Sequence, residues 1–371
     1  MTTNYLPEQV VVEILLRLPV KSLIRFRCVS KRWRLLISDP GFTKSQFGLA
    51  SEHPERFLIS SSSGIRSLGC DVPFGDSSAL RELVVPFQRN CLRVRIIGSC
   101  NGLVCVALHP HKGFYIWNPS TGDHRKLPDP GAPLRGFIYW HGFGYDSSTD
   151  DYKLIVASYR LVKSDSGRSS EGEVFSLNKN SWKGILHDLD YSDGAKEPAG
   201  ILCNGSLHWH LKVSEPARDE IYAFDLAEEK FHEIPMPIQE DERPRRAPFS
   251  SLRNLGGCLC LVGYTRTHID LWRMMEYGIG ESWAPMLRVA YSHVEVYRYH
   301  LNPLWLSRGG QLVLIYAGKE LMISKPEGEI EHVVAFSDSL TCEAAVFVES
   351  LISPNHYGGD ERQRLLCDED R

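Results

Sequence analysis

The feature of this sequence that most constrains its fold is a repeated unit: an apolar run beside a glycine, a tight turn, and then an aromatic run. The glycines that anchor the units are Gly102, Gly144, Gly205, Gly257 and Gly310, at spacings of 42, 61, 52 and 53 residues. Short apolar runs separated by Gly, Asn, Asp and Pro predict antiparallel strands. A period of about 50 residues is typical of propeller blades, so residues 55–350 are expected to form about six blades. A β-sandwich is the alternative, but about 300 residues would be large for one sandwich.

Turn-forming residues support the strand interpretation. Asn101-Gly102 and Asn204-Gly205 are dipeptides that tolerate positive φ, and each precedes an apolar run. The segments 118–122 and 177–181 lie between two apolar runs, where a hairpin turn is expected. Two long polar stretches, 163–172 and 239–248, are expected to be exposed loops.

Residues 5–39 have a different, helical periodicity. A proline and an acid at Pro7-Glu8 favour a helix start, and an apolar stripe follows at spacings of three and four, made of Val11, Ile14, Leu15 and Leu18. Pro19 ends this helix, Val20 opens a second, and Ser30 can cap a third that stops at Asp39-Pro40. We therefore expect a head of three short helices before the β body.

The head is expected to dock on another protein. A unit of about 40 residues rarely buries a sufficient core alone, and this one has more apolar positions than three short helices can hide. Residues 1–45 contain eight cations and three acids, a balance of +5 that leaves −9 for the remainder of a chain whose net charge is −4. A basic helical surface can steer towards an acidic protein or towards nucleic acid, or can simply be solvated.

Composition excludes several other classes. A net charge of −4 argues against a surface that generally coats nucleic acid. No apolar run approaches the about 18 residues needed to span a bilayer, and the first residues lack the pattern of a secretory signal. The ten cysteines are scattered and form no CxxC pair, so we expect buried thiols rather than a zinc site or disulfides, with Cys258 and Cys260 on one face of a strand. The expected location is the cytoplasm, the nucleus or both.

The head resembles the F-box, a helical motif that binds the Skp-type adaptor of cullin-RING ubiquitin ligases. The resemblance rests on residues 6–42, LPEQVVVEILLRLPVKSLIRFRCVSKRWRLLISDPGF. It implies that the adaptor contact is made or supported by Leu6, Pro7, Ile14, Leu15, Leu18, Pro19, Leu23, Val29 and Trp33. Each of these side chains is equally compatible with the internal core of the head, because a helical stripe has the same spacing in both cases.

The body resembles the plant F-box-associated interaction domain, which is kelch-like. The resemblance rests on SCNGLVCV, WNPSTGDHRKLP, GFGYDSSTDDYKLIVAS, EVFSLNKNSWKGI, NGSLHW, IYAFDLAEEKF and IDLWRMMEYGIGESW, in the family order. True kelch repeats carry paired glycines at more regular spacings. In that family the domain captures a protein target, and WRMMEYGIGESW is most similar to the defence-linked branch.

Motifs for catalysis are absent from the sequence: it has no GxSxG, HExxH, P-loop or dinucleotide fingerprint. His109 with His111, and His208 with His210, offer two metal ligands each but no readable third, so ordinary strand histidines are expected. The acids in GYDSSTDDYK, Asp146, Asp150 and Asp151, are expected to be turn formers rather than a cation loop. We expect no metal and no cofactor.

The resulting hypothesis is a mainly β protein of three parts: an F-box at 1–47, a kelch-like propeller at 48–353 and a charged tail at 354–371. The resemblance implies a non-catalytic substrate receptor of a Skp-cullin-F-box type ubiquitin ligase. Its partners would be the adaptor, through it the cullin and RING subunits, and an unidentified target, with no nucleic acid and no membrane. A scaffold bound to the adaptor outside any ligase, and a propeller enzyme, are the alternatives.

Overall fold

The computed structural model describes most of the chain, from Leu6 to Gly358. The described ranges are 6–49, 55–61, 64–70, 79–87, 93–109, 113–131, 138–161, 168–185, 199–213, 218–237, 249–265, 267–290, 301–316, 320–324, 330–335 and 343–358. Over these residues, no helix is long and apolar enough to cross a membrane. The whole of the stretch 239–248, predicted to be a loop, and most of the predicted tail lie outside the described residues.

The head contains four helices, one more than expected: α1 (Glu8–Leu16), α2 (Val20–Phe26), α3 (Lys31–Ser38) and α4 (Pro40–Leu49). The Ser30 hydroxyl caps α3 by accepting a hydrogen bond from the amide of Trp33 at 3.1 Å, as its position predicts. Pro40 does end α3, but it is also the first residue of α4. A proline is well tolerated there because the first helical amide has no partner inside the helix. The carboxylate of Asp39 accepts from the amide of Phe42 at 2.9 Å and caps the new helix.

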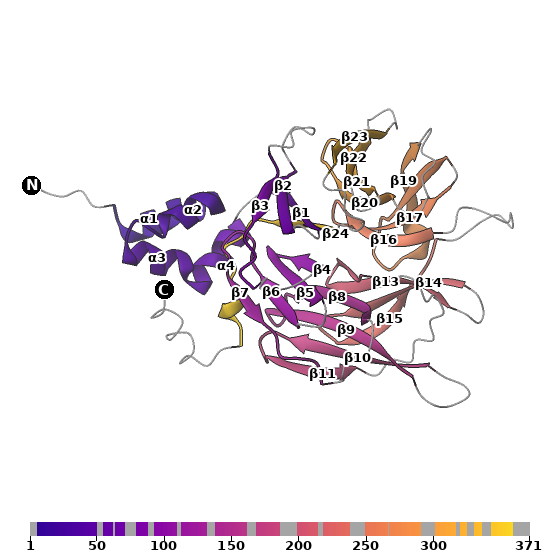
Figure 1. Cartoon of the computed structure of the whole chain (residues 1–371), viewed down its shortest axis with the longest axis horizontal. Helices are drawn as coiled ribbons and strands as arrows, with labels where there is room; N and C mark the ends of the chain where they lie inside the picture. Colours follow the sequence, from indigo (N-terminus) through magenta and orange to yellow (C-terminus); the bar gives the residue numbers. More distant parts are fainter. Residues whose placement is uncertain are drawn as a thin grey trace, which may run out of the picture.

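The body consists of six four-stranded antiparallel sheets, which confirms the expected number of blades (Figure 1). From the centre outwards, the first sheet is β24 (Glu343–Val348), β1 (Glu55–Ser61), β2 (Gly64–Gly69), β3 (Arg81–Leu83); the second is β4 (Arg93–Cys100), β5 (Leu103–His109), β6 (Phe114–Trp117), β7 (His124–Lys126); and the third is β8 (Ile138–Asp146), β9 (Asp151–Leu161), β10 (Arg168–Ser176), β11 (Ser181–Ile185). The fourth is β12 (Ile201–Cys203), β13 (Ser206–Val213), β14 (Arg218–Asp225), β15 (Lys230–Ile234); the fifth is β16 (Phe249–Leu255), β17 (Cys258–Tyr264), β18 (His268–Met274), β19 (Trp283–Ala290); and the sixth is β20 (Leu301–Leu306), β21 (Leu312–Tyr316), β22 (Glu320–Ser324), β23 (Ile330–Ala335). Two single-turn 3-10 helices, η2 (Gly280–Ser282) and η3 (Pro354–His356), follow β18 and β24.

The ring is closed by the C-terminal strand. β24 pairs antiparallel with β1, with Phe57 opposite Val346 and Leu58 opposite Ala345. Strands from the two ends of the body therefore share the first sheet. The chain leaves the sixth sheet after β23 and enters the first sheet as β24, which closes the ring. Closure of this kind leaves only short, outward-facing edges.

The uneven spacing of the anchor glycines has a structural explanation. Gly102, Gly205, Gly257 and Gly310 lie in the turns between the first and second strands of their blades and have positive φ. Gly144 lies within β8, and the equivalent turn of that blade ends at Asp150, which has a φ of 52°. Measured to Asp150, the two irregular spacings become 48 and 55 residues. Segments 118–123 and 177–180 are the predicted hairpin turns, whereas 168–172, expected to be loop, is part of β10.

Apolar residues between neighbouring sheets form the core. One cluster joins the second and third sheets through Leu103, Ile116, Phe143 and Leu154, all fully or almost fully buried. Cys260 is buried in the cluster between the fifth and sixth sheets, and Cys258 lies partly buried against it, in agreement with their predicted common face. Burial raises the pKa of the Cys260 thiol to about 12. The seven cysteines in the described part of the chain are free thiols.

The end of the predicted propeller range, with Leu351, and the start of the predicted tail, with Tyr357, are both integrated into the fold. Leu351 is fully buried in the core of the head, together with Leu15, Leu23 and Ile37. Tyr357, which the sequence assigned to the tail, stacks edge-on against Tyr152 at 5.2 Å between ring centroids. Residues 350–357 are called the strap below, because this segment contacts both the head and the propeller. The charged composition of the predicted tail gave no indication that Tyr357 packs against the propeller.

Candidate docking site on the helical head

Exposed apolar side chains are concentrated on the head. Nine large hydrophobic residues are exposed in the described part of the chain, and six belong to the head: Leu6, Val10, Ile14, Val29, Leu35 and Leu49. Only Val84, Met275 and Ile279 lie on the propeller. Exposed apolar side chains gathered on a small module mark an interaction surface more often than a solvated one.

The structure divides the nine predicted adaptor-contact residues into three groups. Leu15 and Leu23 are 1% and 0% exposed and form the internal core of the head, so they can only support a docking surface from below. Leu18 and Trp33 are partly buried against that core, and the Trp33 ring packs edge-on against Phe26. The residues open to a partner are Leu6, Pro7, Ile14, Pro19 and Val29. The role of each as a contact residue stays a prediction.

Two further exposed residues, Val10 and Leu35, escaped the sequence interpretation. Val10 lies one helical turn before Ile14 on α1, and Leu6 lies four positions earlier, so the spacing of four was a readable signal. Leu35 is exposed although its neighbour Ile37 is fully buried. These residues enlarge the apolar surface that the head offers.

Ion pairs organise part of the charged surface of the head. Arg17 binds Glu13 within α1 at 2.6 Å, and Arg32 of α3 binds Glu8 of α1 at 2.5 Å. Both pairs are well exposed, so each contributes little to stability. The second pair, Arg32 with Glu8, connects the start of α3 to the start of α1.

The head is held against the propeller on its α4 side. Lys44 forms an ion pair with Asp150 in the turn between β8 and β9, and its ammonium lies 5.3 Å above the ring centre of Tyr357. Phe47 packs against the core shared by the second and third sheets. Figure 1 shows the four helices gathered at one side of the ring. The head is therefore a fixed module rather than one on a loose tether.

The strap completes this junction through the second sheet. The Asn118 amide donates to the carbonyl oxygens of Ser350 and Ile352 at 3.0 and 2.8 Å. The Arg125 guanidinium donates to the carbonyl oxygen of Tyr357 at 2.5 Å. Burial lowers the pKa of Arg125. These hydrogen bonds fix the strap's backbone against the propeller. The Leu351 side chain, buried in the core of the head, connects the same segment to the helices.

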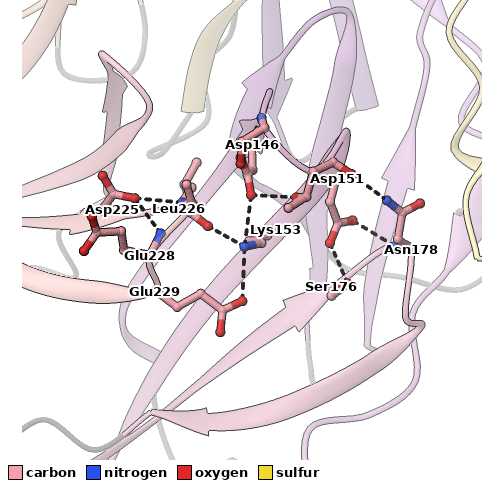
Figure 2. A network of polar contacts seen from close by, with 12 residues as sticks. Asp146, Asp151, Lys153, Ser176, Asn178, Asp225, Leu226, Glu228 and Glu229 are labelled. Carbon is pink, nitrogen blue, oxygen red and sulfur yellow. Dashed lines mark hydrogen bonds and ion pairs between the residues drawn. The ribbon is translucent and has the colours of Figure 1, made fainter.

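A buried polar network positions the third blade against the fourth (Figure 2). Lys153 of β9 is almost fully buried and lies 3.3 Å from an oxygen of Asp146 and 3.1 Å from one of Glu229. It also donates to the carbonyl oxygen of Leu226, which belongs to the neighbouring sheet's last turn. Burial raises the pKa of Asp146, but hydrogen bonds from Ser148, Thr149 and Lys153 outweigh it and bring the pKa to about 2.

The acids predicted to be turn formers are all engaged within the protein. Asp146 accepts from the amide of Ser148 at 2.9 Å, and Asp150 accepts from the Tyr145 hydroxyl at 2.8 Å. Asp151 accepts from the amide of Asn178 at 2.8 Å, which ties two turns of the third blade together (Figure 2). The sequence prediction of turn-forming acids is confirmed.

In the histidine pair on β13, both ring nitrogens of His208 face protein partners, and the Nε2 of His210 lies 3.8 Å from Asp219. The Nδ1 of His208 lies 3.1 Å from the carbonyl oxygen of Ile201, and its Nε2 lies 2.7 Å from the Tyr277 hydroxyl. Burial lowers the pKa of His208 to about 4, so the ring is neutral at physiological pH. Across the described residues, no three His, Cys, Asp or Glu side chains gather to hold a metal. The other predicted pair includes His111, which lies outside those residues.

The arrangement defines a class of protein: a six-bladed propeller that carries a module of four short helices at one side. Comparison with known families agrees. Residues 4–45 match the F-box domain, and residues 56–353 match the F-box associated beta propeller domain. The chain belongs to the plant family of F-box proteins with this propeller, as the sequence resemblance indicated.

The individual relatives cover most of the chain. It is 28% identical over 369 residues to the F-box/kelch-repeat protein At3g23880 of Arabidopsis thaliana, covering 94% of this chain and 96% of the relative. It is 31% identical over 336 residues to F-box protein CPR1 of the same plant, covering 84% and 79%. Among solved structures, a streptogramin B lyase is similar at a TM-score of 0.39 and 15% identity, covering 78% of this chain and 86% of that chain.

Proposed function

We propose that this protein is the substrate-recognition subunit of a Skp-cullin-F-box type ubiquitin ligase. The F-box binds a Skp-type adaptor, through which cullin and RING subunits join, and the propeller binds a target protein. The ligase then holds the target's lysines near a ubiquitin-loaded enzyme, which raises their effective concentration. The chain contributes selection and proximity and makes no bond itself. This function places the protein in the cytoplasm, the nucleus or both.

The observation that carries the proposal is the exposed apolar surface of the head. Its side chains lie on helices that pack around a separate buried core, which contains Leu15, Leu23 and Leu351. A closed core shows that the outward-facing side chains are not needed for folding of the head. Apolar residues that are exposed without a folding role are best explained by a partner that covers them.

The test introduces negative charges on this apolar surface and leaves the core untouched. In Ile14→Asp with Val29→Asp, two residues that are 48% and 60% exposed would each place a charge in an apolar interface. Two lost interface anchors should weaken adaptor binding at least about 100-fold. The measurement is the affinity of the purified full-length chain for a Skp-type adaptor, by titration calorimetry. A circular dichroism melt checks that the variant remains folded.

The matched control is Val84→Asp on the propeller. Val84 is 88% exposed and follows β3, so its change adds a charge of the same kind outside the head. The control should bind the adaptor like the unmodified chain. Equal adaptor affinity in the head variant and the unmodified chain would refute the assignment of the docking surface.

The separate role of the propeller is tested by recovery of targets from plant cells under proteasome inhibition. The unmodified chain should recover adaptor, cullin and target, whereas Ile14→Asp with Val29→Asp should recover the target alone. A chain that recovers adaptor without cullin would support the scaffold function instead. The identity of the recovered target would also show which pathway the protein acts in, including any role in defence.

A further inference from the structure

A basic cleft lies where the head meets the first sheet. Its volume is about 280 Å³, and its walls come from α2 on one side and from β1, β2 and β3 on the other. The apolar part of its lining is Val20 and Ile24 of α2, Leu83 of β3 and Phe347 of β24. Figure 1 shows α2 beside the sheet that contains these strands. The proposed adaptor surface is apolar and exposed, whereas this cleft is basic. Adaptor binding therefore does not explain the cleft.

The charges in the cleft are unbalanced. Four cations line it, Lys21 and Arg25 of α2, Arg56 of β1 and Arg81 of β3, against the single acid Glu349. Glu349 is engaged with Arg56 at 3.6 Å. Lys21, Arg25 and Arg81 have no acidic partner within the described part of the chain. Among the described residues, the lining of the cleft therefore carries a net charge of +3 that no other side chain neutralises.

One of the four cations is held in place. The Nε of Arg56 donates to the Ser67 hydroxyl at 2.7 Å, and the Arg56 side chain is only 19% exposed. A guanidinium fixed in this way loses little freedom when it binds an anion, which favours binding. Lys21 and Arg25 lie one helical turn apart on α2, so both can reach the same ligand.

A polar group in the wall of the cleft adds a second, independent signal. The Oγ of Ser120, in the turn between β6 and β7, is buried and has no hydrogen-bond partner among the described residues. The Ser120 amide is satisfied, because it donates to the Asn118 side chain at 2.7 Å. A buried hydroxyl without a partner costs free energy unless a ligand or water satisfies it. A hydroxyl can donate to a phosphoryl oxygen.

We propose that this cleft binds a small phosphorylated molecule with at least two phosphoryl groups, which bridges the head and the propeller. Three unneutralised cations and an oriented arginine match a ligand with more than two negative charges. The volume suits one small polyanion and is too small for a nucleic-acid duplex or a helix. Cations from both parts of the chain would contact the same ligand, so binding would stabilise their relative position. This inference does not depend on adaptor or target binding.

The test uses pyrophosphate as the probe and the purified full-length chain. Pyrophosphate should raise the melting temperature and give a measurable heat of binding, whereas sulfate at matched ionic strength should not. The affinity should fall as salt is added, because the cations are accessible to solvent. Orthophosphate should bind at least tenfold more weakly than pyrophosphate. Equal effects of sulfate and pyrophosphate would overturn the proposal.

The variants assign the binding to the cleft. Arg25→Gln with Arg81→Gln removes one cation from each wall, and each lost contact should weaken pyrophosphate binding about fivefold. The matched control, Lys31→Gln with Arg34→Gln, removes two exposed cations of α3 that do not line the cleft. The control should keep the affinity of the unmodified chain. Equal losses in the two variants would show a diffuse charge effect and contradict the assignment.

A third arm separates a small ligand from a phosphorylated segment of a protein. A short peptide with one phosphoserine should compete with pyrophosphate only weakly, because it brings a single phosphoryl group. Competition by the peptide at lower concentration than pyrophosphate would contradict a free small ligand. The binding assay contains neither adaptor nor target, so its failure leaves the ligase function to be judged by its own experiment.

Discussion

At the scale of single residues, two glycines in equivalent turns have different tasks. Gly102 and Gly205 are both in turns between the first and second strands of a blade, with φ of 82° and 74°. A Cβ on Gly205 would meet nothing within 4 Å, whereas a Cβ on Gly102 would lie 2.1 Å from the Ser350 hydroxyl and 2.9 Å from the Val348 carbonyl oxygen. Gly102 therefore permits the close approach of the strap as well as the turn.

The pair of variants Gly102→Ala and Gly205→Ala should separate these two roles. Gly205→Ala should cost about 1–2 kcal/mol of the free energy of unfolding, from the left-handed backbone alone. Gly102→Ala should cost about 1–3 kcal/mol more, because the new methyl group overlaps the strap. The measurement is urea unfolding of both full-length variants. Equal costs would show that the strap yields without penalty and that our view of it as fixed is wrong.

The buried network around Lys153 should make stability depend on acidity. The pKa of Asp146 is lowered from 3.8 to about 2 in the folded protein, and that of Glu229 is lowered too. A carboxyl with a lowered pKa stabilises the fold above its ordinary pKa, and that contribution disappears as the pH falls to the folded value. The contribution of Asp146 should therefore be complete at about pH 5 and decline between about pH 4 and pH 2.

The check is the difference in unfolding free energy between the unmodified chain and Asp146→Asn. Asparagine keeps the shape of the side chain but cannot titrate, so the difference should shrink as the pH falls through this window. Asp225, a half-buried acid beside the turn of the next blade, has no ion pair to Lys153 and provides the control through Asp225→Asn. A difference that stays constant between about pH 5 and pH 3 would contradict the role assigned to Asp146.

At the scale of elements, the head shows what sequence patterns can and cannot reveal. The starts of α2 and α3 and the end of α3 follow from Pro19, Ser30 and Asp39-Pro40, which are local signals. The helix after Pro40 was missed because the same proline can stop one helix and begin the next. Which face of α1 is buried was not predictable either. Ile14 and Leu15 are adjacent in sequence, and only the tertiary packing of the head decides that Leu15 is covered while Ile14 is exposed.

The propeller shows the same limit. Blade number and most turns are local properties, so the repeated unit predicted them. The pairing of β24 with β1 joins residues almost 300 positions apart, and the repeated unit in the sequence does not predict it. The cleft was equally hidden, because its cations come from α2, β1 and β3.

The strap can be tested through its apolar anchor in the head. Leu351→Ala removes a fully buried side chain from the core that contains Leu15 and Leu23, and should cost about 2–5 kcal/mol. Hydrogen exchange should show faster opening of α1 to α3, while amides of the fourth and fifth sheets stay protected. Leu49→Ala, at an exposed position of α4, is the control and should change neither. Unchanged exchange in the head of Leu351→Ala would disprove the strap's role there.

At the scale of the whole molecule, head and propeller depend on each other. Leu351 and Phe47 cross the junction in opposite directions, one into the head and one onto the propeller. A chain that begins at residue 48 should therefore fold its propeller but expose the apolar strap. We expect such a chain to self-associate, as measured by light scattering, while the full-length chain remains dispersed. The same deletion with Leu351→Ser should associate less, and no change between the two deletions would contradict this explanation.

The pairing of β24 with β1 also has a consequence for the protein's synthesis. β1 leaves the ribosome early but must wait for residues 343–348 before its sheet acquires an inner strand. The head is translated still earlier, yet its core lacks Leu351 until almost the whole chain has been made. A nonsense codon just before β24 would remove only the last 29 residues, but it would leave the ring open and the head's core incomplete. The first blade to be translated is thus the last to be finished, and quality control of the nascent chain can act on the protein until β24 and Leu351 have emerged.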